Sequence, residues 1–457
     1  MADKMKVAVI GAGLAGSEAA YFLAQRGVSV FLFESKTLAL GPAQSVKTAC
    51  ELVCTNSLKS AAQASAHGML KLEMEKFGSV VLKAAKITCV PAGSALAVDR
   101  DKFSQTVDQM LNEHELITRI EKDVKNPIEL FESYGVNSVI VASGPLTNAG
   151  LSSWLQSEIC GEDFFFYDAI APVVDADTLD YSKLYFKDRH VDPKESENVA
   201  DYLNIPLDKT QYDEFVKNLT FAEKVKPKNF EKEIFFESCL PIDLMAERGP
   251  ETPRFGPMRP IGLEKEDGHR PHGVVQLRRE NLLGDAFNLV GFQTRLTYPE
   301  QLRVLRKLPG LEEAKFLKLG SVHRNSFLNA KKVLNWDLSC KKFPSIHFAG
   351  QMIGVEGYSE SAAMGLYAAM SVYCKLTKEE FPQFPVESAM GALVNYIMTS
   401  PKPVPSNINF GLLPPVTLTR EQRKDKKRKI VKKLLAADRG KDVFDQFFNK
   451  HFDSVFN

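Results

Sequence analysis

Residues 6–16 read KVAVIGAGLAG, and this stretch decides the fold. Its first five residues form a short β-rich run, and the other six form a glycine turn. In such a turn Gly11 permits the tight bend, Gly13 lets the backbone approach a pyrophosphate, and Gly16 allows a helix to pack closely on the strand. The residues that we assign to the phosphate contact are Gly11, Ala12, Gly13, Leu14, Ala15 and Gly16.

The residues after the turn complete a strand–helix–strand unit. Residues 17–26 have the apolar spacing of a helix, and residues 28–33 form a second strand that ends in Glu34. The amino end of the helix directs free N–H groups and the positive end of its dipole at the phosphates. Glu34 stands where an acidic residue holds the ribose hydroxyls. These parts and their short links predict a parallel βαβ unit that binds a dinucleotide.

Length and composition indicate a globular chain of two or three domains. It has 457 residues, of which 44% are hydrophobic and 25% charged, so neither disorder nor a fibrous fold is expected. Its apolar runs, such as residues 136–141, are far shorter than the ~20 residues that span a bilayer. The start of the chain is short and polar, without a secretory signal. We therefore expect no membrane contact and a cytoplasmic location.

Cysteine content and net charge limit the kinds of site that the chain can contain. Seven cysteines at irregular spacing, without paired CxxC motifs, argue against a disulfide framework and against a structural zinc site. We predict no metal site. The net charge is +1, so any contact with a nucleic acid has to come from local patches of positive charge.

Later strand patterns identify the dinucleotide. Residues 138–142 form one buried-strand pattern, and residues 345–349 form another that runs into Gly350. Residues 359–373 then show helical spacing and are rich in Ala, Ser and Met. The glycine turn alone does not separate FAD from NAD. The late strand, glycine and helix favour FAD, because in flavoproteins with two dinucleotide sites a comparable element closes on the isoalloxazine ring.

The middle of the chain differs from both flanks. It contains aromatic clusters, many prolines and arginine-rich strand patterns such as residues 274–279. We expect an α/β fold in which a glutathione-reductase-like, Rossmann-type FAD domain is interrupted by an α+β insertion domain. The predicted divisions are 1–150 for the first part of the FAD domain, 151–329 for the insertion, 330–418 for the second part of the FAD domain, and 419–457 for a basic helix and tail.

Two cysteines lie among polar residues that could hydrogen-bond a thiolate or a substrate. Cys54 lies in ELVCTNS just beyond the βαβ unit, where flavin enzymes often face the ring, and Cys239 lies in FESCLPID. A cysteine is more often a small buried hydrophobe than a nucleophile, so the residues alone leave both roles open. The cysteines that we interpret as structural are Cys50, Cys89, Cys160, Cys340 and Cys374.

Positive charge gathers in the tail and beside aromatic residues. Residues 420–433 carry Lys or Arg at nine of 14 positions. This run fits contact with RNA phosphates, but it also fits a solvated terminal helix, which is the simpler interpretation. Arginines near aromatic residues in 255–260, and in 323–325, suit phosphates or stacked rings, with a solvated surface as the alternative.

Taken together, these segments resemble the TrmFO family, the folate- and FAD-dependent tRNA uracil-5-methyltransferases. The resemblance runs from about Val7 to Pro415 and fades past Leu418, so it implies nothing for the basic tail. Two departures are small, since Thr55 and Ser143 stand where the family usually has Ser and Thr. The matching stretches, in the family's order, are VIGAGLAGSEAA, ELVCTNSLKS, ASGPLTN, FESCLPIDLMAERG, FGPMRPIGLE, VVQLRREN, LVGFQT, VHRNSF, FAGQMIGVEGYSESAAMGL and NINFGLLPP.

The resemblance implies an activity and its co-substrates. Members of the family reduce FAD with NAD(P)H, take a methylene group from 5,10-methylenetetrahydrofolate, and transfer it with reducing equivalents to C5 of uridine 54 in the tRNA T-loop. Their two functional cysteines match Cys54 and Cys239, so one is expected to add to C6 of the uracil and the other to act as acid and base. The sequence does not decide which is which. The implied partners are tRNA and folate, with no obligate protein partner evident.

Other functions fit part of the same pattern. One is the same chemistry on a 23S ribosomal RNA uridine, because the flavin and folate sites do not reveal which RNA loop enters. Another is the flavin enzyme that modifies a wobble uridine of tRNA with a partner protein, which should lack the LVCTNS and FESCLPID signatures. A third, of a different class, is a non-catalytic flavin-bound RNA chaperone.

Overall fold

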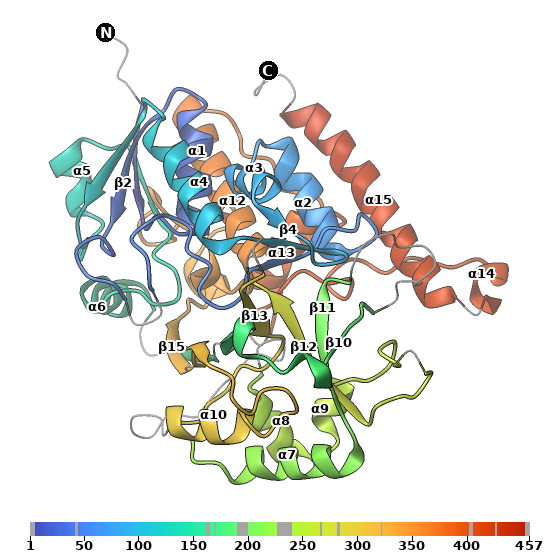
Figure 1. Cartoon of the computed structure of the whole chain (residues 1–457). Helices are drawn as coiled ribbons and strands as arrows, with labels where there is room; N and C mark the ends of the chain where they lie inside the picture. Colours follow the sequence, from blue (N-terminus) through green and yellow to red (C-terminus); the bar gives the residue numbers. More distant parts are fainter. Residues whose placement is uncertain are drawn as a thin grey trace.

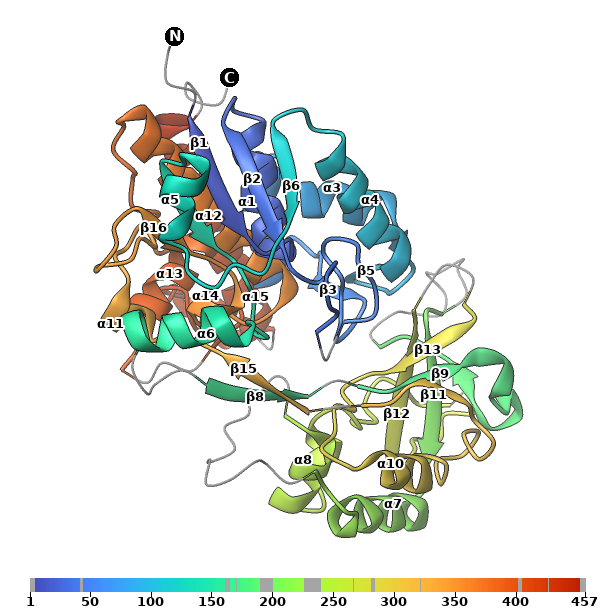
Figure 2. The same cartoon turned by 90° about the vertical axis from the view of Figure 1, so that its left-hand side faces the viewer.

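The protein forms two lobes joined by a narrow ribbon (Figures 1 and 2). The computed structural model describes residues 5–41, 44–160, 165–169, 171–189, 200–225, 240–265, 267–280, 284–320, 322–401, 405–425 and 427–452. The upper lobe in Figure 1 contains both ends of the described chain, and the lower lobe is formed by its middle. Cys239, predicted to be catalytic, lies outside the described residues.

The upper lobe is built on a five-stranded sheet in the order β16-β7-β1-β2-β6, in which all neighbours are parallel. These strands run parallel because helical crossovers return the chain to the same edge each time. The predicted α/β, Rossmann-type fold is therefore confirmed. Four of the strands end within two residues of the expected bounds, and β6 was not predicted. The strands are β1 (Lys6–Ile10), β2 (Ser29–Glu34), β6 (Ile117–Glu121), β7 (Ser138–Val141) and β16 (Ile346–Phe348).

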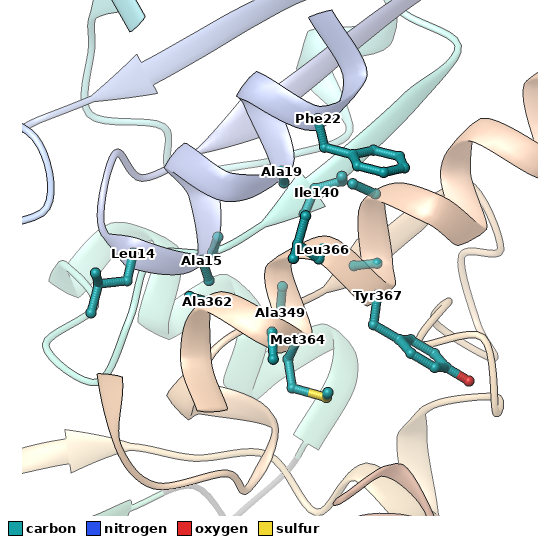
Figure 3. Close-up of a cluster of buried hydrophobic side chains, with 14 of the residues drawn as sticks. Leu14, Ala15, Ala19, Phe22, Ile140, Ala349, Ala362, Met364, Leu366 and Tyr367 are labelled. Atoms are coloured by element: carbon teal, nitrogen blue, oxygen red, sulfur yellow. The ribbon is translucent and has the colours of Figure 1, made fainter. Parts of the chain in front are cut away.

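Two helices from opposite parts of the chain form the centre of this lobe. Helix α1 (Leu14–Ala24) packs along α12 (Tyr358–Thr377), and Figure 3 shows side chains of the two helices in one buried apolar cluster. The backbones meet closely, since a Cβ on Gly365 would lie 2.1 Å from the carbonyl oxygen of Ala15. The other helices of the lobe are α2 (Ala66–Lys76), α3 (Val80–Ile87), α4 (Arg100–Asn112), α5 (Glu129–Tyr134), α6 (Ala149–Leu155), α11 (Ala330–Val333) and α13 (Ala389–Thr399).

The lower lobe has a six-stranded antiparallel sheet in the order β10-β11-β12-β13-β9-β14. Helices cover one face of this sheet and enclose a separate apolar core. The strands are β9 (Val173–Asp175), β10 (Tyr185–Phe186), β11 (Tyr202–Leu207), β12 (Gly273–Arg279), β13 (Ala286–Leu289) and β14 (Phe316–Lys318). The helices are α7 (Lys209–Phe221), α8 (Ile242–Arg248), α9 (Thr252–Phe255) and α10 (Tyr298–Leu305).

The two lobes are linked at two places. An antiparallel ribbon of β8 (Phe165–Ala169) and β15 (Val322–Ser326) carries the chain into and out of the lower lobe (Figure 2). A small sheet of β3 (Ser57–Ser60), β4 (Cys89–Val90) and β5 (Ala95–Val98) belongs to the upper lobe and faces the lower one. The predicted division at residue 150 stays a prediction, although Leu151 and Leu155 pack into the core of the upper lobe.

The tail consists of α14 (Arg420–Lys424) and the long α15 (Arg428–His451), which runs along the outer edge of the upper lobe (Figure 1). Phe444 and Phe452 are buried against Phe77, so the second half of α15 is part of the same core. The remaining short helical turns are Gln156–Cys160, Ala176–Thr178, Tyr181–Lys183 and Gln351–Ile353. Among the described residues, no helix is both long and apolar enough to cross a membrane.

Candidate functional site

A cleft opens at the carboxyl ends of β1, β2 and β7, where parallel sheets of this kind bind ligands. Its empty volume, open solvent included, is about 1250 Å³. Of the predicted phosphate-binding residues, Gly11, Gly13, Leu14 and Ala15 line the cleft, whereas Ala12 and Gly16 lie behind it. Glu34 and Gly350 line the cleft as well, so residues far apart in the sequence meet there.

The three glycines of the turn are needed for different reasons. A Cβ on Gly16 would lie 1.8 Å from the carbonyl oxygen of Gly11, so α1 could not approach β1 with any larger residue there. Gly11 has φ of +99° and a Cβ there would lie 2.5 Å from the oxygen of Ala142. Gly13 has nothing within 4 Å of a Cβ position, so its backbone faces open space at the start of α1. That open space is where a pyrophosphate fits.

Glu34 is tied to the glycine turn by hydrogen bonds to three backbone N–H groups. Its Oε2 accepts from Ala12 at 2.8 Å, and its Oε1 accepts from Ser35 at 2.7 Å and from Lys36 at 2.9 Å. A carboxylate has about four acceptor sites, so one remains for a ligand hydroxyl. Glu34 therefore shapes the turn, and its contact with a ribose stays a prediction.

Gly350 brings the late segment onto the first turn of α1. It has φ of +81°, and a Cβ there would lie 2.9 Å from the Cβ of Ala15. The cleft then continues past Gln351 to Tyr358 and Ser361 at the amino end of α12. It thus has a phosphate end at α1 and a second end at α12, which fits a dinucleotide carrying a large ring system such as FAD.

The loop that contains Cys54 borders the α12 end of the cleft. Glu51 and Val53 line the cleft, and Cys54 is half-buried directly after them. The backbone N–H groups of Cys54 and Thr55 donate to the Tyr358 hydroxyl at 2.7 and 3.2 Å. Burial, and then the nearby Cys54, raise the pKa of Tyr358 well above its usual value. Tyr358 therefore stays protonated and fixes the backbone on which the thiol stands.

The lower lobe holds the other side of the same loop. Arg278 of β12 donates to Thr55 Oγ1 and, at 2.9 Å, to Asn56 Oδ1. Asn56 donates in return to the carbonyl oxygen of Arg279 at 2.7 Å. Lys318 of β14 donates to the carbonyl oxygen of Val53 at 3.1 Å. The Cys54 loop is therefore held between the two lobes.

Cationic side chains contact this loop, and the carboxylates of Glu51 and Glu280 lie beside them. Arg100 of α4 donates to the carbonyl oxygen of Leu52 at 2.9 Å and forms an ion pair of 2.5 Å with Glu280 of the lower lobe. Burial lowers the pKa of Lys318, and the charge of Arg100 lowers it further. A half-buried thiol among cations is the setting in which cysteines react, rather than the apolar setting of a structural cysteine.

The predicted site residues did not include Tyr358, Arg100, Lys318, Asn56 or Arg278. Three of them lay inside stretches quoted for the family resemblance, namely Asn56 in ELVCTNSLKS, Arg278 in VVQLRREN and Tyr358 in the stretch around Gly350. Arg100 and Lys318 carried no such signal. Their roles depend on contacts between segments that are far apart along the chain.

The second predicted catalytic residue, Cys239, lies just before the described chain resumes at Leu240. Asp243 then anchors the start of α8, with its Oδ2 2.6 Å from Nε of the buried Arg295. The side chains of residues 323–325, noted for their positive charge, also lie outside the described set. A meeting of Cys54 and Cys239 over one substrate therefore stays a prediction.

The cysteines interpreted as structural lie in other surroundings. Cys50, Cys340 and Cys374 are buried, and Cys89 is exposed. Burial raises the pKa of Cys50 and of Cys160 to about 12. Burial also raises the pKa of Cys374 to about 11. Thiols with a raised pKa carry little thiolate near neutral pH, which suits a structural role.

Comparisons with known proteins agree with this fold. The pattern of the family described as "Glucose inhibited division protein A" matches residues 6–380. Two crystal structures of Aquifex aeolicus GidA share the fold, with a TM-score of 0.65 at 17% and 18% identity, covering 97% of this chain and 73% and 76% of theirs. The fold and the cleft thus define a dinucleotide-binding protein of the GidA type.

Sequence relatives give the particular family. Proteins named "Methylenetetrahydrofolate--tRNA-(uracil-5-)-methyltransferase TrmFO" are 44% identical in Natranaerobius thermophilus, over 98% of this chain and 100% of that protein, and 45% identical in Aquifex aeolicus, over 94% and 95%. The chain belongs to the TrmFO family, as the sequence analysis predicted. The first of these alignments extends past Leu418 into the basic tail, where the resemblance was expected to fade.

Proposed function

We propose that this protein methylates C5 of a uridine in tRNA, with 5,10-methylenetetrahydrofolate as the carbon donor and FAD bound in the cleft. The observation that carries the proposal is the position of Cys54, half-buried on a loop that borders the cleft and is held by both lobes. The names of relatives at 44–46% identity supply the reaction class. NAD(P)H as the external reductant belongs to the same proposal.

The chemistry explains why a thiol is needed. C5 of uracil is a poor nucleophile until a thiolate forms a bond to C6, which moves the C5=C6 electron pair into an enolate. C5 then bonds to the methylene carbon, a base removes the C5 proton as the bond from that carbon to the folate nitrogen breaks, and tetrahydrofolate leaves. The thiolate leaves C6 as the methylene group is reduced to methyl. FAD, when bound, supplies the reducing equivalents that turn the methylene group into a methyl group.

The residues of this chain have distinct roles in that scheme. Cys54 or Cys239 is the nucleophile, and the other is the acid and base. Tyr358 and Arg278 are positioning residues, because they bind the backbone and the side chains next to Cys54 rather than the reacting atoms. Holding a nucleophile at a defined place is worth several orders of magnitude in rate, so this support is part of the function.

Within tRNA, the proposed methylation site is uridine 54 of the T-loop. A 23S ribosomal RNA uridine is the competing target. The decisive experiment maps 5-methyluridine in tRNA and in ribosomal RNA from a strain that lacks the gene. Loss of the mark from the tRNA T-loop is expected, and loss from ribosomal RNA alone would assign the other target. Loss of a wobble-uridine modification would instead favour the wobble-uridine alternative.

The carbon source has its own test. Labelled methylenetetrahydrofolate should transfer its carbon to tRNA in a reaction that requires reduced flavin. Transfer from labelled S-adenosylmethionine would overturn the proposal. RNA binding without any transfer, unchanged by Cys239→Ala, would point to the chaperone alternative.

A trapping experiment tests the covalent step. RNA that carries 5-fluorouracil should form a stable adduct with the protein, because fluorine cannot leave C5 as a proton does. The adduct should disappear in Cys54→Ala or in Cys239→Ala, and the variant that loses it identifies the nucleophile. An adduct that persists in both variants would assign the addition to another residue.

A further inference from the structure

The start of the tail is an exposed, strongly cationic arm, which we call the basic arm and define as the described residues of 420–435. Seven of its cationic side chains are exposed, and Glu421 and Asp425 are its only acidic residues. Within the described chain, none of these seven cations forms an ion pair. They are Arg420, Lys424, Lys427, Arg428, Lys429, Lys432 and Lys433.

The second half of α15 has a different character. Its buried residues begin at Ala436 and continue through Gly440 and Phe444, so this half packs on the upper lobe. Its charges are mixed, and Asp445 pairs with Lys76 at 2.8 Å. Nothing in the first two turns of the helix is buried. The helix therefore extends beyond the packing surface that stabilises it.

The charge pattern of the basic arm opposes helix formation. Arg428 and Lys432 are four residues apart, as are Lys429 and Lys433, and like charges at this spacing repel each other. Cations near the amino end of a helix also oppose its dipole. Cationic pairs at this spacing are confined to the first half of α15, whereas the second half carries charges of both signs. Local conflicts of this kind mark sites selected for binding.

The basic arm lies near the site without being part of it. Before the arm, the chain contacts the amino end of α12, where the N–H of Ile408 donates to Glu360 at 3.2 Å. From Ile408 to Thr419 the chain spans at most about 40 Å. No residue of the arm lines the cleft. In Figures 1 and 2, α14 lies on the side of the upper lobe that faces the lower lobe.

We propose that the basic arm of the protein binds the sugar–phosphate backbone of the substrate tRNA. The contacted part of the tRNA lies outside the T-arm, which carries the uridine that enters the cleft. The proposal rests on the proposed function, which makes a tRNA the substrate. Exposed, unpaired cations suit a polyanion, because each phosphate contact releases counterions. Ile430 and Leu434 are 57% and 42% exposed on the same helix and add an apolar edge for ribose. The arm thus enlarges the contact from one loop to the body of the molecule.

The test compares two substrates and two matched variants of the full-length holoprotein. One variant carries Lys429→Gln, Lys432→Gln and Lys433→Gln in the basic arm. The control carries Lys217→Gln, Lys265→Gln and Lys331→Gln, three exposed lysines outside the arm that form no ion pair within the described chain. Each protein is assayed for KM and kcat on a full tRNA transcript and on a hairpin of the T-arm alone, and Kd for both RNAs is measured against salt.

We expect the basic-arm variant to raise KM and Kd for the full tRNA several-fold and to leave kcat unchanged. The slope of log Kd against log salt should become shallower by about 2–3 for three lost phosphate contacts. The hairpin and the control variant should behave like the wild type. An unchanged Kd for the full tRNA, or an equal loss for the hairpin or in the control, overturns the proposal.

Two further measurements distinguish a failure of the tRNA-binding proposal from a failure of the proposed function and from binding to a lipid surface. If wild-type protein methylates neither RNA, the proposed function fails, whereas the binding comparison still tests the basic arm. Flotation with vesicles of anionic phospholipid tests a membrane partner. Vesicle binding that depends on the three arm lysines, together with unchanged tRNA binding, would assign the arm to a lipid surface instead.

Discussion

In the main sheet of the upper lobe all five strands run parallel, whereas in the main sheet of the lower lobe all six strands are antiparallel. The parallel sheet brings the carboxyl ends of β1, β2 and β7 to one edge, and the cleft forms from the turns that leave them. The antiparallel sheet offers no such edge. It contributes side chains from its strands, such as Arg278 and Lys318, to a loop of the other lobe.

The two ends of the site are therefore formed in different ways. The phosphate end of the cleft depends on residues 11–16, which are neighbours in the sequence, and its geometry is local. The reactive end depends on Cys54 and on supporting groups from α4, α12, β12 and β14. The phosphate end is sensitive to steric changes in one turn. The reactive end is sensitive to the packing of one lobe against the other.

Removal of the thiol should have the largest effect. Cys54→Ala should lower turnover by at least about 10³-fold, since a missing nucleophile or acid–base group cannot be replaced by binding. Flavin content and thermal unfolding should stay close to those of the wild type. Cys160→Ala and Cys374→Ala serve as controls and should keep most of the activity. Full activity in Cys54→Ala would show that the chemistry resides elsewhere.

The glycine turn offers a matched pair of variants that separates cofactor binding from folding. Gly13→Val should fold but lose FAD, because its side chain would enter the open space that the pyrophosphate needs. Gly16→Val should lower the free energy of unfolding by several kcal/mol, because its Cβ would meet the backbone of Gly11 at 1.8 Å. Flavin absorbance and denaturant unfolding measure the two effects. Normal flavin content in Gly13→Val would remove the phosphate-loop assignment.

The contact between the lobes should have an intermediate effect. Arg278→Leu removes the donors to Thr55 and Asn56 and leaves Asn56 Oδ1 buried without that bond. A buried acceptor left unpaired costs about 1–3 kcal/mol, so kcat should fall by about ten- to a hundredfold while FAD stays bound. Arg279→Leu is the matched control, because its guanidinium lies over Phe186 instead. Equal losses in both variants would mean that charge, and not the loop, matters.

The smallest effect on activity is expected for a buried carboxyl group that contributes to the free energy of unfolding and does not line the cleft. Glu73 accepts from the N–H groups of Ala389 and Met390 at 2.5 and 2.8 Å, and burial raises its pKa to about 8. Because the folded pKa lies above the unfolded one, the stabilisation is complete below about pH 4.5 and is lost as the pH rises towards 8. The free energy of unfolding should therefore fall over this range.

Glu73→Gln should make that pH profile flatter at a cost of about 1 kcal/mol for one lost hydrogen bond. A residual slope should persist, because burial also raises the pKa of Glu18 to about 7. Glu75→Gln, at an exposed position of the same helix, is the control. Denaturant unfolding at several pH values gives the answer, and a profile in Glu73→Gln as steep as the wild type's would rule out this carboxyl group as the cause.

Sequence patterns predicted the upper lobe well and the lower lobe only in outline. The strands that flank the glycine turn and the late strand before Gly350 appear within two residues of the expected bounds. The lower lobe was expected as α+β without a strand order, because antiparallel pairing over long distances leaves little trace in local periodicity. The end of the chain was expected as a basic helix and tail, and the structure adds that the second half of α15 packs into the core through Phe444.

The sequence by itself determined the dinucleotide turn, the family and the two candidate thiols, because each depends on residue types at short, fixed spacing. Only the tertiary structure decided that Cys54 stands on a loop held by Tyr358 and Arg278, which are more than two hundred residues away along the chain. Only it divided α15 into a packed half and an exposed cationic half. The physical reason is that burial and hydrogen-bond partners are properties of the folded chain. A local sequence pattern does not specify which distant segment will contact it.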